Sequence, residues 1–587
     1  MKKKIGDNNQ QKEIRRFIFS LLKNYKLRIL LTFVLSVVFV VFSLYIPILA
    51  GRAIDSIAGQ GKVIFADVKL NVIKIIIFAL IAASSQWLMS IINNGITYNT
   101  VRDLRKKVFE KLMRVPIAFT DKTGSGSIVS RLISDIDSFA DGLLMGFTQL
   151  FTGVITVIGT LCFMLAMNPA ITAAVVLLTP LSLFAAKFIA GKTYSMFKLQ
   201  SERRADQTGF TDEMIGNMKT VKAFSYENSA ARKFDEINKS LSAASLRATF
   251  YSSLTNPVTR FVNSVVYMAV ALFGALAAVS GALSIGMLVS FLAYANQYTK
   301  PFNEISGVIT ELQNAVACAG RVLALLNEDE VSPEGELHAD CSRGTVEFKH
   351  VDFSYTENSK LIENFSFKAN PGEKIAIVGP TGCGKTTLIN LLMRFYDVDS
   401  GEILVNGVNI NDISRKELRS NFGMVLQETW LQTATVRENL KLGAPDISDD
   451  EMISAAKLTH AHGFIKRLEH GYDTVIGENG SSLSEGQKQL LCITRVMLTE
   501  SPMLILDEAT SSIDTRTELI VQRAFDLLMK GKTSFVVAHR LSTVTDADKI
   551  IVMKDGKIIE TGTHLELLNK NGFYADLFNS QFKTNIA

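Results

Sequence analysis

The sequence predicts a fold of two parts: a bundle of six transmembrane helices with long cytoplasmic extensions, followed by a soluble α/β domain. Long apolar runs fill the chain between residue 29 and about residue 315, whereas the remainder mixes apolar and polar residues as a water-soluble α/β protein does. The length of 587 residues is also too great for a single hydrophobic core, so at least two domains are expected.

The composition excludes several classes of protein. A net charge of +5 gives no strong basic field, which argues against a nucleic-acid-binding protein. The five cysteines are scattered and form no CxxC pair, which favours reduced thiols over disulfides or a metal site. The first residues, MKKKIGDNNQQKEIRRF, lack the apolar core and cleavage site of a removable signal peptide, so we expect residues 1–28 to form a cytoplasmic elbow segment.

Six segments have the roughly 20 apolar residues that a membrane-spanning helix needs. Buried helices of a soluble protein are the alternative, but runs such as LLTFVLSVVFVVFSLYIPIL are too long and too free of charge for that. We therefore expect a transmembrane domain over residues 29–325. Its predicted spans are 29–50, 72–92, 147–167, 170–190, 259–280 and 283–303.

The charges of the loops predict the orientation of the spans. The N-terminal segment and the long loops 96–146 and 191–250 are rich in Lys and Arg, whereas the turns AMNPA and VSGALS carry no charge. Basic loops stay on the cytoplasmic side, so both termini and both long loops are predicted to be cytoplasmic. Helical spacing in these loops, interrupted by Pro116, Gly124 and Gly216, predicts stalks whose tips contact the soluble domain.

A few polar side chains lie within or beside the predicted spans. Arg260, Lys300 and Glu304 are expected toward the inner leaflet. Intramembrane charges usually face a bundle interior or a wet cavity, but snorkelling or a structural ion pair explains them equally well. Both interpretations stay open, and no pattern here identifies a substrate. The uncharged members of the same set are Asn263, Asn296 and Gln297.

A phosphate-binding loop is predicted early in the soluble domain. An acidic linker over 326–344 precedes this domain, which extends over 345–587. Its strand KIAIVG leads into GPTGCGKTT, which matches G-x-x-x-x-G-K-[ST] between a strand and a helix. Glycines let backbone N–H groups surround a triphosphate, Lys385 reaches the β- and γ-phosphates, and Thr386 is a ligand for Mg²⁺. The predicted ATP-binding residues of this loop are Gly379, Pro380, Thr381, Gly382, Cys383, Gly384, Lys385, Thr386 and Thr387.

Four further polar residues end or follow predicted strands in an order that fits ATP hydrolysis. In MLILDEATSSID, Asp507 is expected to organise Mg²⁺ and Glu508 to orient or deprotonate the attacking water. Gln427 is expected to bridge metal, water and a mobile segment, and His539 to contact the γ-phosphate. Tyr355 precedes the loop and is a candidate to stack on adenine. Alone, Tyr355 would be a packing residue and His539 a structural histidine, so the prediction rests on the ordered set.

A second anion cradle is predicted at SSLSEGQKQ, where a small polar turn leads into an apolar helical pattern. A helix N-terminus presents unpaired backbone N–H groups that suit an anion. Its expected contact residues are Ser484, Glu485, Gly486 and Gln487.

Together these motifs resemble those of ATP-binding cassette (ABC) exporters of the half-transporter type, over nearly the whole chain. The phosphate loop, Gln427, LSEGQ, LILDEAT, SSID with Asp514, and His539 occur in the order of that family. In the membrane half, DKTGSGSIVSRLISDIDSF and MKTVKAFSYE are similar to exporter stalk segments, and Glu478 in TVIGENG matches a segment that contacts stalk tips.

The resemblance implies a head-to-tail pair of cassettes that binds two ATP molecules with Mg²⁺ and drives alternating access. It implies a second half-transporter chain as partner, and a place in the bacterial plasma membrane with the ATPase domain in the cytoplasm. The second cradle would then contact the γ-phosphate of ATP held by the partner's phosphate loop. Soluble cassette machines are disfavoured by the six spans, whereas a cassette-gated regulator stays open. Amphiphilic drug-like compounds and lipids are the expected substrates.

Glu485 departs from the LSGGQ pattern of the family, whereas Glu508 is present. This combination resembles one subunit of the heterodimeric bacterial multidrug exporters, in which the partner carries the intact signature. We therefore expect a heterodimer with one efficient ATP site, and a homodimer is the alternative. Cys383 is expected to be a small filler of the phosphate loop, where alkylation would block nucleotide binding.

Overall fold

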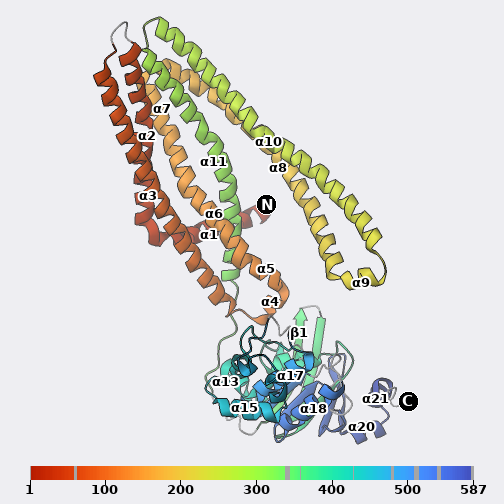
Figure 1. The fold of residues 1–587 in the computed structure, drawn as a ribbon. Helices are drawn as coiled ribbons and strands as arrows, with labels where there is room; N and C mark the ends of the chain where they lie inside the picture. The colour runs from red at the N-terminus through yellow and green to blue at the C-terminus, as the bar shows by residue number, and fades with distance from the viewer. Residues whose placement is uncertain are drawn as a thin grey trace. The chain divides into compact units, whose positions relative to one another are not determined.

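The computed structural model divides into two compact units. The first contains Met1–Arg114 and Thr123–Glu328, and the second contains Val115–Lys122 and Asp329–Ala587. Figure 1 shows the course of the chain. The structure describes residues 2–58, 63–337, 344–356, 359–426, 429–477, 482–507, 515–537 and 544–582.

The first unit consists of long helices. Asn168 begins one of them by accepting hydrogen bonds from the backbone of Ala170 and Ile171, with Pro169 in the first turn. The helices are α1 (Lys2–Leu22), η1 (Lys23–Tyr25), α2 (Lys26–Ala58), α3 (Phe65–Leu112), α5 (Ser125–Ser130), η2 (Arg131–Asp135), α6 (Ile136–Met145), η3 (Gly146–Leu150), α7 (Phe151–Met167), α8 (Pro169–Gly216), α9 (Met218–Ala223), α10 (Glu227–Val279) and α11 (Ile285–Leu326).

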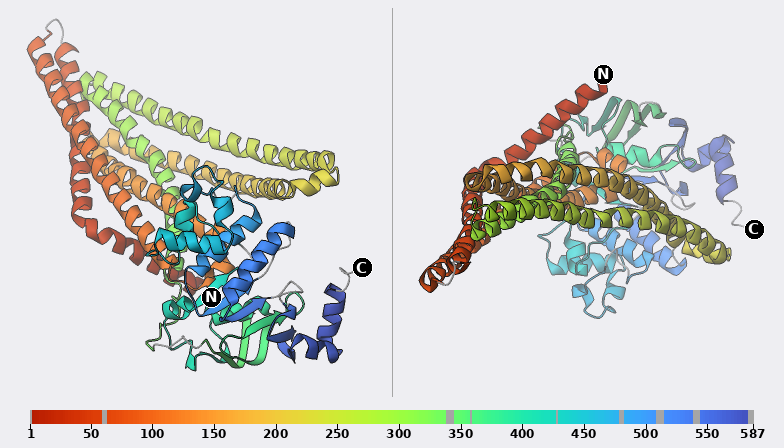
Figure 2. Two further views of the ribbon diagram at one scale, coloured as in Figure 1. Left: turned by 60° about the horizontal axis from the view of Figure 1, so that its bottom comes forward. Right: turned by 90° about the horizontal axis from the view of Figure 1, so that it is seen from above.

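These helices extend well beyond the predicted spans, because their apolar segments continue without a break into charged stalks. α10 has 53 residues and α8 has 48, and the short helix α9 joins them. Figures 1 and 2 show α8 and α10 side by side along their length. The predicted stalks and the break near Gly216 are therefore confirmed, whereas the predicted ends of the spans describe only the apolar part of each helix.

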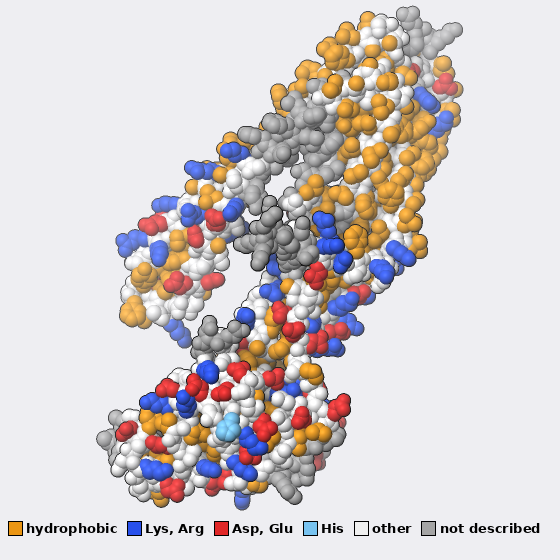
Figure 3. Space-filling model, turned by 180° about the vertical axis from the view of Figure 1, so that it is seen from behind, with side chains coloured by type: hydrophobic (Ala, Val, Ile, Leu, Met, Phe, Trp, Pro, Cys, Tyr) orange, Lys and Arg blue, Asp and Glu red, His pale blue; other side chains and the backbone are white. Residues whose placement is uncertain are grey.

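Four helical stretches of the described residues are long and apolar enough to cross a membrane: Gln11–Ile57, Phe65–Leu112, Ser125–Met167 and Arg260–Val279. They contain or overlap the predicted spans 29–50, 72–92, 147–167 and 259–280. The spans 170–190 and 283–303 fall in α8 and α11, whose side chains are described only in part, and stay predictions. Figure 3 shows hydrophobic side chains covering one end of this unit and charged side chains gathering along the stalks.

α11 is the central packing partner of the first unit, with contacts to α2, α6, α7 and α10. Its buried Phe291 and Tyr294 pack with Leu44 of α2 and Met164 of α7. The Tyr294 hydroxyl donates a hydrogen bond to the carbonyl of Leu44. This packing fixes α2, α7 and α11 around a shared cavity.

The described residues of the second unit form two sheets. An antiparallel sheet has the strand order β2-β1-β4-β5, and a six-stranded sheet has the order β10-β9-β3-β8-β7-β6 with β9, β3, β8, β7 and β6 parallel. The strands are β1 (Val346–Thr356), β2 (Ser359–Ala369), β3 (Lys374–Val378), β4 (Ser400–Val405), β5 (Val408–Asn409), β6 (Phe422–Val425), β7 (Met503–Asp507), β8 (Thr533–Val537), β9 (Lys549–Lys554) and β10 (Lys557–Gly562).

Helices pack on the six-stranded sheet, whose strands are mostly buried as is usual for parallel sheets. The helices of this unit are α4 (Ile117–Thr123, whose last residue groups with the first unit), α12 (Lys385–Leu392), α13 (Arg415–Ser420), α14 (Val436–Lys441), α15 (Asp449–Leu458), α16 (His462–Ile465), η5 (Gly471–Asp473), α17 (Glu485–Met497), α18 (Thr515–Met529), α20 (His564–Asn569) and α21 (Phe573–Phe582). The predicted class, a membrane helical bundle with an α/β nucleotide-binding domain, is thus confirmed.

The tip helix α4 belongs with the second unit although it lies between α3 and α5 in the sequence. The Tyr396 hydroxyl donates a hydrogen bond to the Asp121 carboxylate of α4. A stalk tip thus contacts the soluble domain, as its helical spacing predicted.

The segment after α11 also packs on the second unit. α11 ends at Leu326, and Asp329–Leu337 follows the surface of this unit as an extended strap. The buried Arg415 guanidinium donates to the Ser332 carbonyl at 2.7 Å and to a Glu334 carboxylate oxygen at 3.1 Å. The part of the predicted linker that the structure describes is therefore held in place rather than free.

Replacing Arg415 with alanine is expected to lower the free energy of unfolding of the second unit by about 1–3 kcal/mol, because the strap loses a buried donor. Thermal unfolding of the intact transporter measures this change. The exposed Arg467 provides a matched control, and Arg467→Ala should change the value by less than about 0.5 kcal/mol. Equal melting temperatures of the two variants would contradict the role of Arg415.

Candidate functional site

The phosphate loop connects β3 to α12, as its motif predicted. Gly382 and Gly384 have φ values of 84° and 102°, which side-chain-bearing residues rarely adopt. A Cβ atom at Gly384 would also lie 2.6 Å from Ile362 Cδ1. Glycine is therefore needed at these two positions for the loop to adopt this turn. The turn brings the loop's backbone N–H groups to the N-terminus of α12, where an anion is favoured.

Lys385 is held over this loop. Its ammonium group donates to the carbonyls of Gly379 at 2.7 Å and Pro380 at 2.9 Å, and its side chain is buried. Its positive charge thus lies beside the loop amides. Thr386 is exposed on the first turn of α12, whereas Thr387 is buried.

Cys383 is a buried filler of the loop. Its side chain is 3% exposed, and its sulfur lies 3.9 Å from Lys385 Nζ. Burial raises the pKa of the Cys383 thiol, although Lys385 partly opposes this effect. Since the thiolate is the reactive form, the folded loop protects this cysteine from alkylating reagents.

Tyr355, at the end of β1, lies beside the start of α12. Its hydroxyl lies 3.4 Å from Thr387 Oγ1 and accepts a hydrogen bond from Asn390 Nδ2 at 3.2 Å. Phe353 and Tyr396 meet its ring edge to face, at centroid distances of 4.9 and 5.0 Å. The side chain is still 47% exposed, which leaves ring surface for a base.

Asp507 ends β7 at the same edge of the sheet as the phosphate loop. β8 lies between β3 and β7, and all three strands are parallel, so their carboxyl ends meet. Asp507 is 8% exposed. Among the described residues, no group of three or more His, Cys, Asp or Glu side chains is arranged to hold a metal ion. Gln427, Glu478, Glu508, Asp514 and His539 lie outside the described residues.

The second cradle is the N-terminus of α17. Ser484 is its N-cap: the hydroxyl oxygen accepts from Gln487 N at 3.3 Å, and Gln487 Oε1 accepts from Ser484 N at 3.0 Å. The backbone N–H groups of Glu485 and Gly486, in the first turn, have no intrahelical acceptor. They are the donors that an anion would meet.

The Glu485 carboxylate has a partner that the sequence analysis missed. Lys488 Nζ lies 2.7 Å from Glu485 Oε1, and Thr429 Oγ1 donates to Oε2 at 3.3 Å. The Lys488 ammonium lowers the pKa of the Glu485 carboxyl. The i,i+3 spacing was the available signal for this pair. The negative charge expected in the cradle is therefore balanced within the chain.

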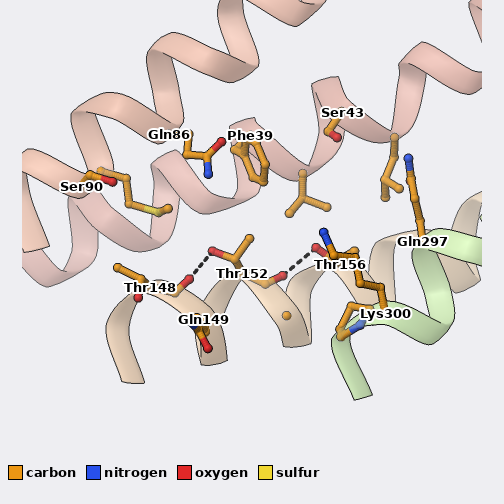
Figure 4. Close-up of a pocket in the computed structure, with 15 residues that line it drawn as sticks. Phe39, Ser43, Gln86, Ser90, Thr148, Gln149, Thr152, Thr156, Gln297 and Lys300 are labelled. Atoms are coloured by element: carbon orange, nitrogen blue, oxygen red, sulfur yellow. Dashed lines mark hydrogen bonds between the residues drawn. The ribbon is translucent and has the colours of Figure 1, made fainter. Parts of the chain in front are cut away.

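The first unit contains a cavity of about 510 Å³ between α2, α3, α7 and α11, with η3 extending its wall. Figure 4 shows Thr148, Thr152 and Thr156 along one side and Gln86 and Ser90 across from them, with Gln297 and Lys300 of α11 at the end beside Thr156. Each threonine hydroxyl donates to the carbonyl four residues earlier at 2.7 Å, so its oxygen lone pairs remain for a ligand.

Among the described residues that line this cavity, one carries a charged side chain. Lys300 contributes an ammonium group, and no carboxylate occurs among the described residues that line the cavity. Arg260, on α10, is exposed and does not line it, and the Glu304 side chain lies outside the described residues. The other polar lining residues are Ser43, Gln86, Ser90 and Gln149.

Both units match known families. Residues 29–302 match the ABC transporter transmembrane region, and residues 362–511 match the ABC transporter family. The chain belongs to the ABC transporter family, as a half-transporter of the exporter type whose membrane region is fused to its ATP-binding domain. It couples ATP hydrolysis to transport across a membrane and dimerises.

Individual relatives cover nearly the whole chain. An uncharacterized ABC transporter ATP-binding protein, YfiC of Bacillus subtilis, is 37% identical and covers 99% of this chain and 96% of its own. A fatty acid ABC transporter ATP-binding/permease protein of Mycobacterium bovis is 39% identical over 88% of this chain and 82% of its own. A putative multidrug export ATP-binding/permease protein of Staphylococcus aureus is 34% identical, over 97% of this chain and 100% of its own. Among solved structures, a bacterial Atm1-family ABC exporter with ATP bound has a TM-score of 0.78 and is 25% identical. The match covers 96% of this chain and 99% of that chain.

Cys383 is expected to react with iodoacetamide at least about tenfold more slowly in the folded transporter than in the unfolded chain, because it is buried and its thiol pKa is raised. Mass spectrometry of a variant with the other four cysteines replaced by alanine measures the rate. Cys383→Ala should keep ATPase activity within about twofold if the thiol is only a filler. Rapid labelling of the folded protein would contradict the buried geometry.

Proposed function

We propose that this chain exports an amphiphile with an anionic head group, as one subunit of a heterodimeric ABC exporter. The observation that carries the substrate class is the cation Lys300 in a polar cavity whose described lining contains no carboxylate. The Lys300 ammonium would attract an anionic head group in this cavity, whereas a lipophilic cation would meet a like charge. The amide N–H groups of three glutamine side chains would donate to the head group's oxygens, and the three threonine oxygens would accept from any hydroxyl group that it carries.

The relatives support two substrate classes. The Mycobacterium bovis relative is a fatty acid transporter by its name, which fits the anionic class. The Staphylococcus aureus relative is a putative multidrug exporter, which makes drug-like amphiphiles the second candidate. The sign of the charge in the cavity favours the acidic amphiphile.

The proposed orientation places both termini and the ATP-binding domain in the cytoplasm. Basic residues concentrate in the stalk segments 96–146 and 191–250, and the turns AMNPA and VSGALS are uncharged. In this orientation the turn between α2 and α3 lies outside the cell.

Within the ATP-binding unit, the phosphate-loop amides and Lys385 would bind the triphosphate, and Tyr355 would stack on adenine. The Thr386 hydroxyl and the Asp507 carboxylate are hard oxygen donors of the type that Mg²⁺ prefers, so these residues fit the ion. When bound, Mg²⁺ would neutralise part of the negative charge of the phosphates. Gln427, Glu508, Asp514 and His539 keep the roles expected from the family motifs.

The altered signature supports a heterodimer. Glu485 stands where the family pattern has glycine, in a chain that retains Glu508. The efficient site would combine the phosphate loop, Asp507 and Glu508 of this chain with the partner's signature. The other site would use Ser484–Gln487 of this chain and turn over slowly.

The substrate proposal is tested by ligand binding to the reconstituted transporter. A long-chain fatty acid should bind about tenfold more weakly to Lys300→Gln than to the parent, while the fatty alcohol of equal length should bind both equally. Ser43→Ala is the matched control, because it changes the same cavity without changing its charge. Preference of the parent for tetraphenylphosphonium over the fatty acid would instead support the drug-like class.

The heterodimer proposal is tested by Mg-ATPase activity with and without a co-expressed transporter chain encoded beside this one. We expect the chain alone to show less than about a tenth of the activity of the pair, and Glu508→Gln to abolish the pair's activity. Glu485→Gly should leave the pair's rate within about twofold, since this signature serves the slow site. High activity of the chain alone, raised further by Glu485→Gly, would establish a homodimer.

A further inference from the structure

A second hollow lies between α2 and α3, on the opposite face of α2 from the cavity of Figure 4. Its volume is about 390 Å³. No residue of α2 lines both spaces, because the two sets of α2 residues point in opposite directions around the helix. We call it the α2–α3 groove, and it is lined by Val41, Phe42, Tyr45, Leu49, Arg52, Lys74 and Phe78.

The groove has an aromatic wall. Phe78 of α3 meets Phe42 and Tyr45 of α2 edge to face, with ring centroids 4.9 and 5.7 Å apart. These rings and two aliphatic side chains form an apolar surface suited to a hydrocarbon chain. Beside the groove, Ile76 and Leu80 of α3 are 54% and 62% exposed, as expected for a face that meets lipid.

Two cations complete the groove, one from each helix. Arg52 comes from α2 and Lys74 from α3, and no carboxylate occurs among the described residues that line the groove. Asp55 lies one turn from Arg52, but its carboxylate accepts hydrogen bonds from Ser284 Oγ and Gly286 N of α11, both at 2.7 Å. The charge of the groove is therefore positive.

Both cations lie near the outer ends of the predicted spans: Lys74 is the third residue of 72–92, and Arg52 follows 29–50 by two residues. In the proposed orientation this is the level of the outer lipid head groups. Lys74 lies about 14 Å along α3 from its first residue, and Arg52 about 9 Å from the end of α2. Lys74 also interrupts the apolar run NVIKIIIFALIAA, where a cation without an anionic neighbour is unfavourable. The outer position of these cations rests on the proposed orientation of the α2–α3 turn, and not on which molecule is transported.

We propose that the α2–α3 groove binds an anionic phospholipid of the outer leaflet. Its phosphate group contacts Arg52 and Lys74, and one acyl chain lies along Phe42, Tyr45 and Phe78. Because the two cations come from different helices, the bound lipid bridges α2 and α3 near their outer ends.

The experiment uses a tryptophan at the groove wall as a reporter of lipid contact. Phe78→Trp is made in a transporter whose Trp87 and Trp430 are replaced by phenylalanine, and the full dimer is reconstituted into bilayers. Quenching by brominated phosphatidylglycerol is compared with quenching by brominated phosphatidylcholine. Ile76→Trp, on the exposed face of α3, serves as the reporter of ordinary lipid contact.

We expect the Phe78→Trp reporter to prefer phosphatidylglycerol, and Arg52→Gln and Lys74→Gln each to reduce that preference about fivefold. Lys69→Gln is the matched control, since Lys69 is an exposed lysine of α3 that does not line the groove, and it should keep the preference. Excess inorganic phosphate should not remove it.

Three results would overturn the proposal. Equal quenching by the two lipids would mean that Arg52 and Lys74 only extend toward water. Loss of the preference for phosphatidylglycerol in excess inorganic phosphate would show that the two cations bind a free anion rather than a lipid. Quenching at the Ile76→Trp reporter, but by neither lipid at the Phe78→Trp reporter, would show that the partner chain covers the groove.

Discussion

The ATP-binding unit depends on the parallel pairing of β3, β8 and β7. Val537 of β8 is the register partner of both Ile377 in β3 and Asp507 in β7, so the three strands end together. The phosphate loop and Asp507 are therefore neighbours in space, although more than a hundred residues of sequence separate them. Buried strands resist slipping, because a shift of one residue would turn apolar side chains outward and move every loop at this edge.

A comparable constraint in the membrane unit is the close packing of α2 and α11. A Cβ atom at Gly286 would lie 1.9 Å from the Gly51 carbonyl oxygen, so the two backbones touch here. Ser290 donates to the Pro47 carbonyl at 2.8 Å, and Asp55 accepts from the backbone N–H of Gly286. With one face of α2 fixed in this way, its remaining surface lines the central cavity and the α2–α3 groove.

Features formed by consecutive residues could be predicted from the sequence. Features formed where separate helices pack together could not. The phosphate loop was predicted because its strand, glycines and Lys385 are consecutive. The predicted spans 170–190 and 259–280 mark only the apolar parts of α8 and α10, since hydropathy marks where an apolar segment ends and not where a helix ends. Arg52 and Lys74 were missed because they come from different helices, and only the packing of α2 on α3 makes them neighbours.

The pairing of Glu485 with Lys488 changes the physical meaning of the altered signature. An unbalanced carboxylate beside a triphosphate would oppose binding by charge, but Lys488 lies 2.7 Å from this carboxylate and on the same helix. What remains is shape: a side chain at the first helical position, where the family pattern has glycine. In the proposed site a triphosphate would have to approach the backbone N–H groups of this turn closely, so added bulk would hinder the approach without repelling the ligand at a distance. A cradle of this kind suits a site that holds ATP but closes poorly, which is the property that an asymmetric pair of cassettes requires of one half.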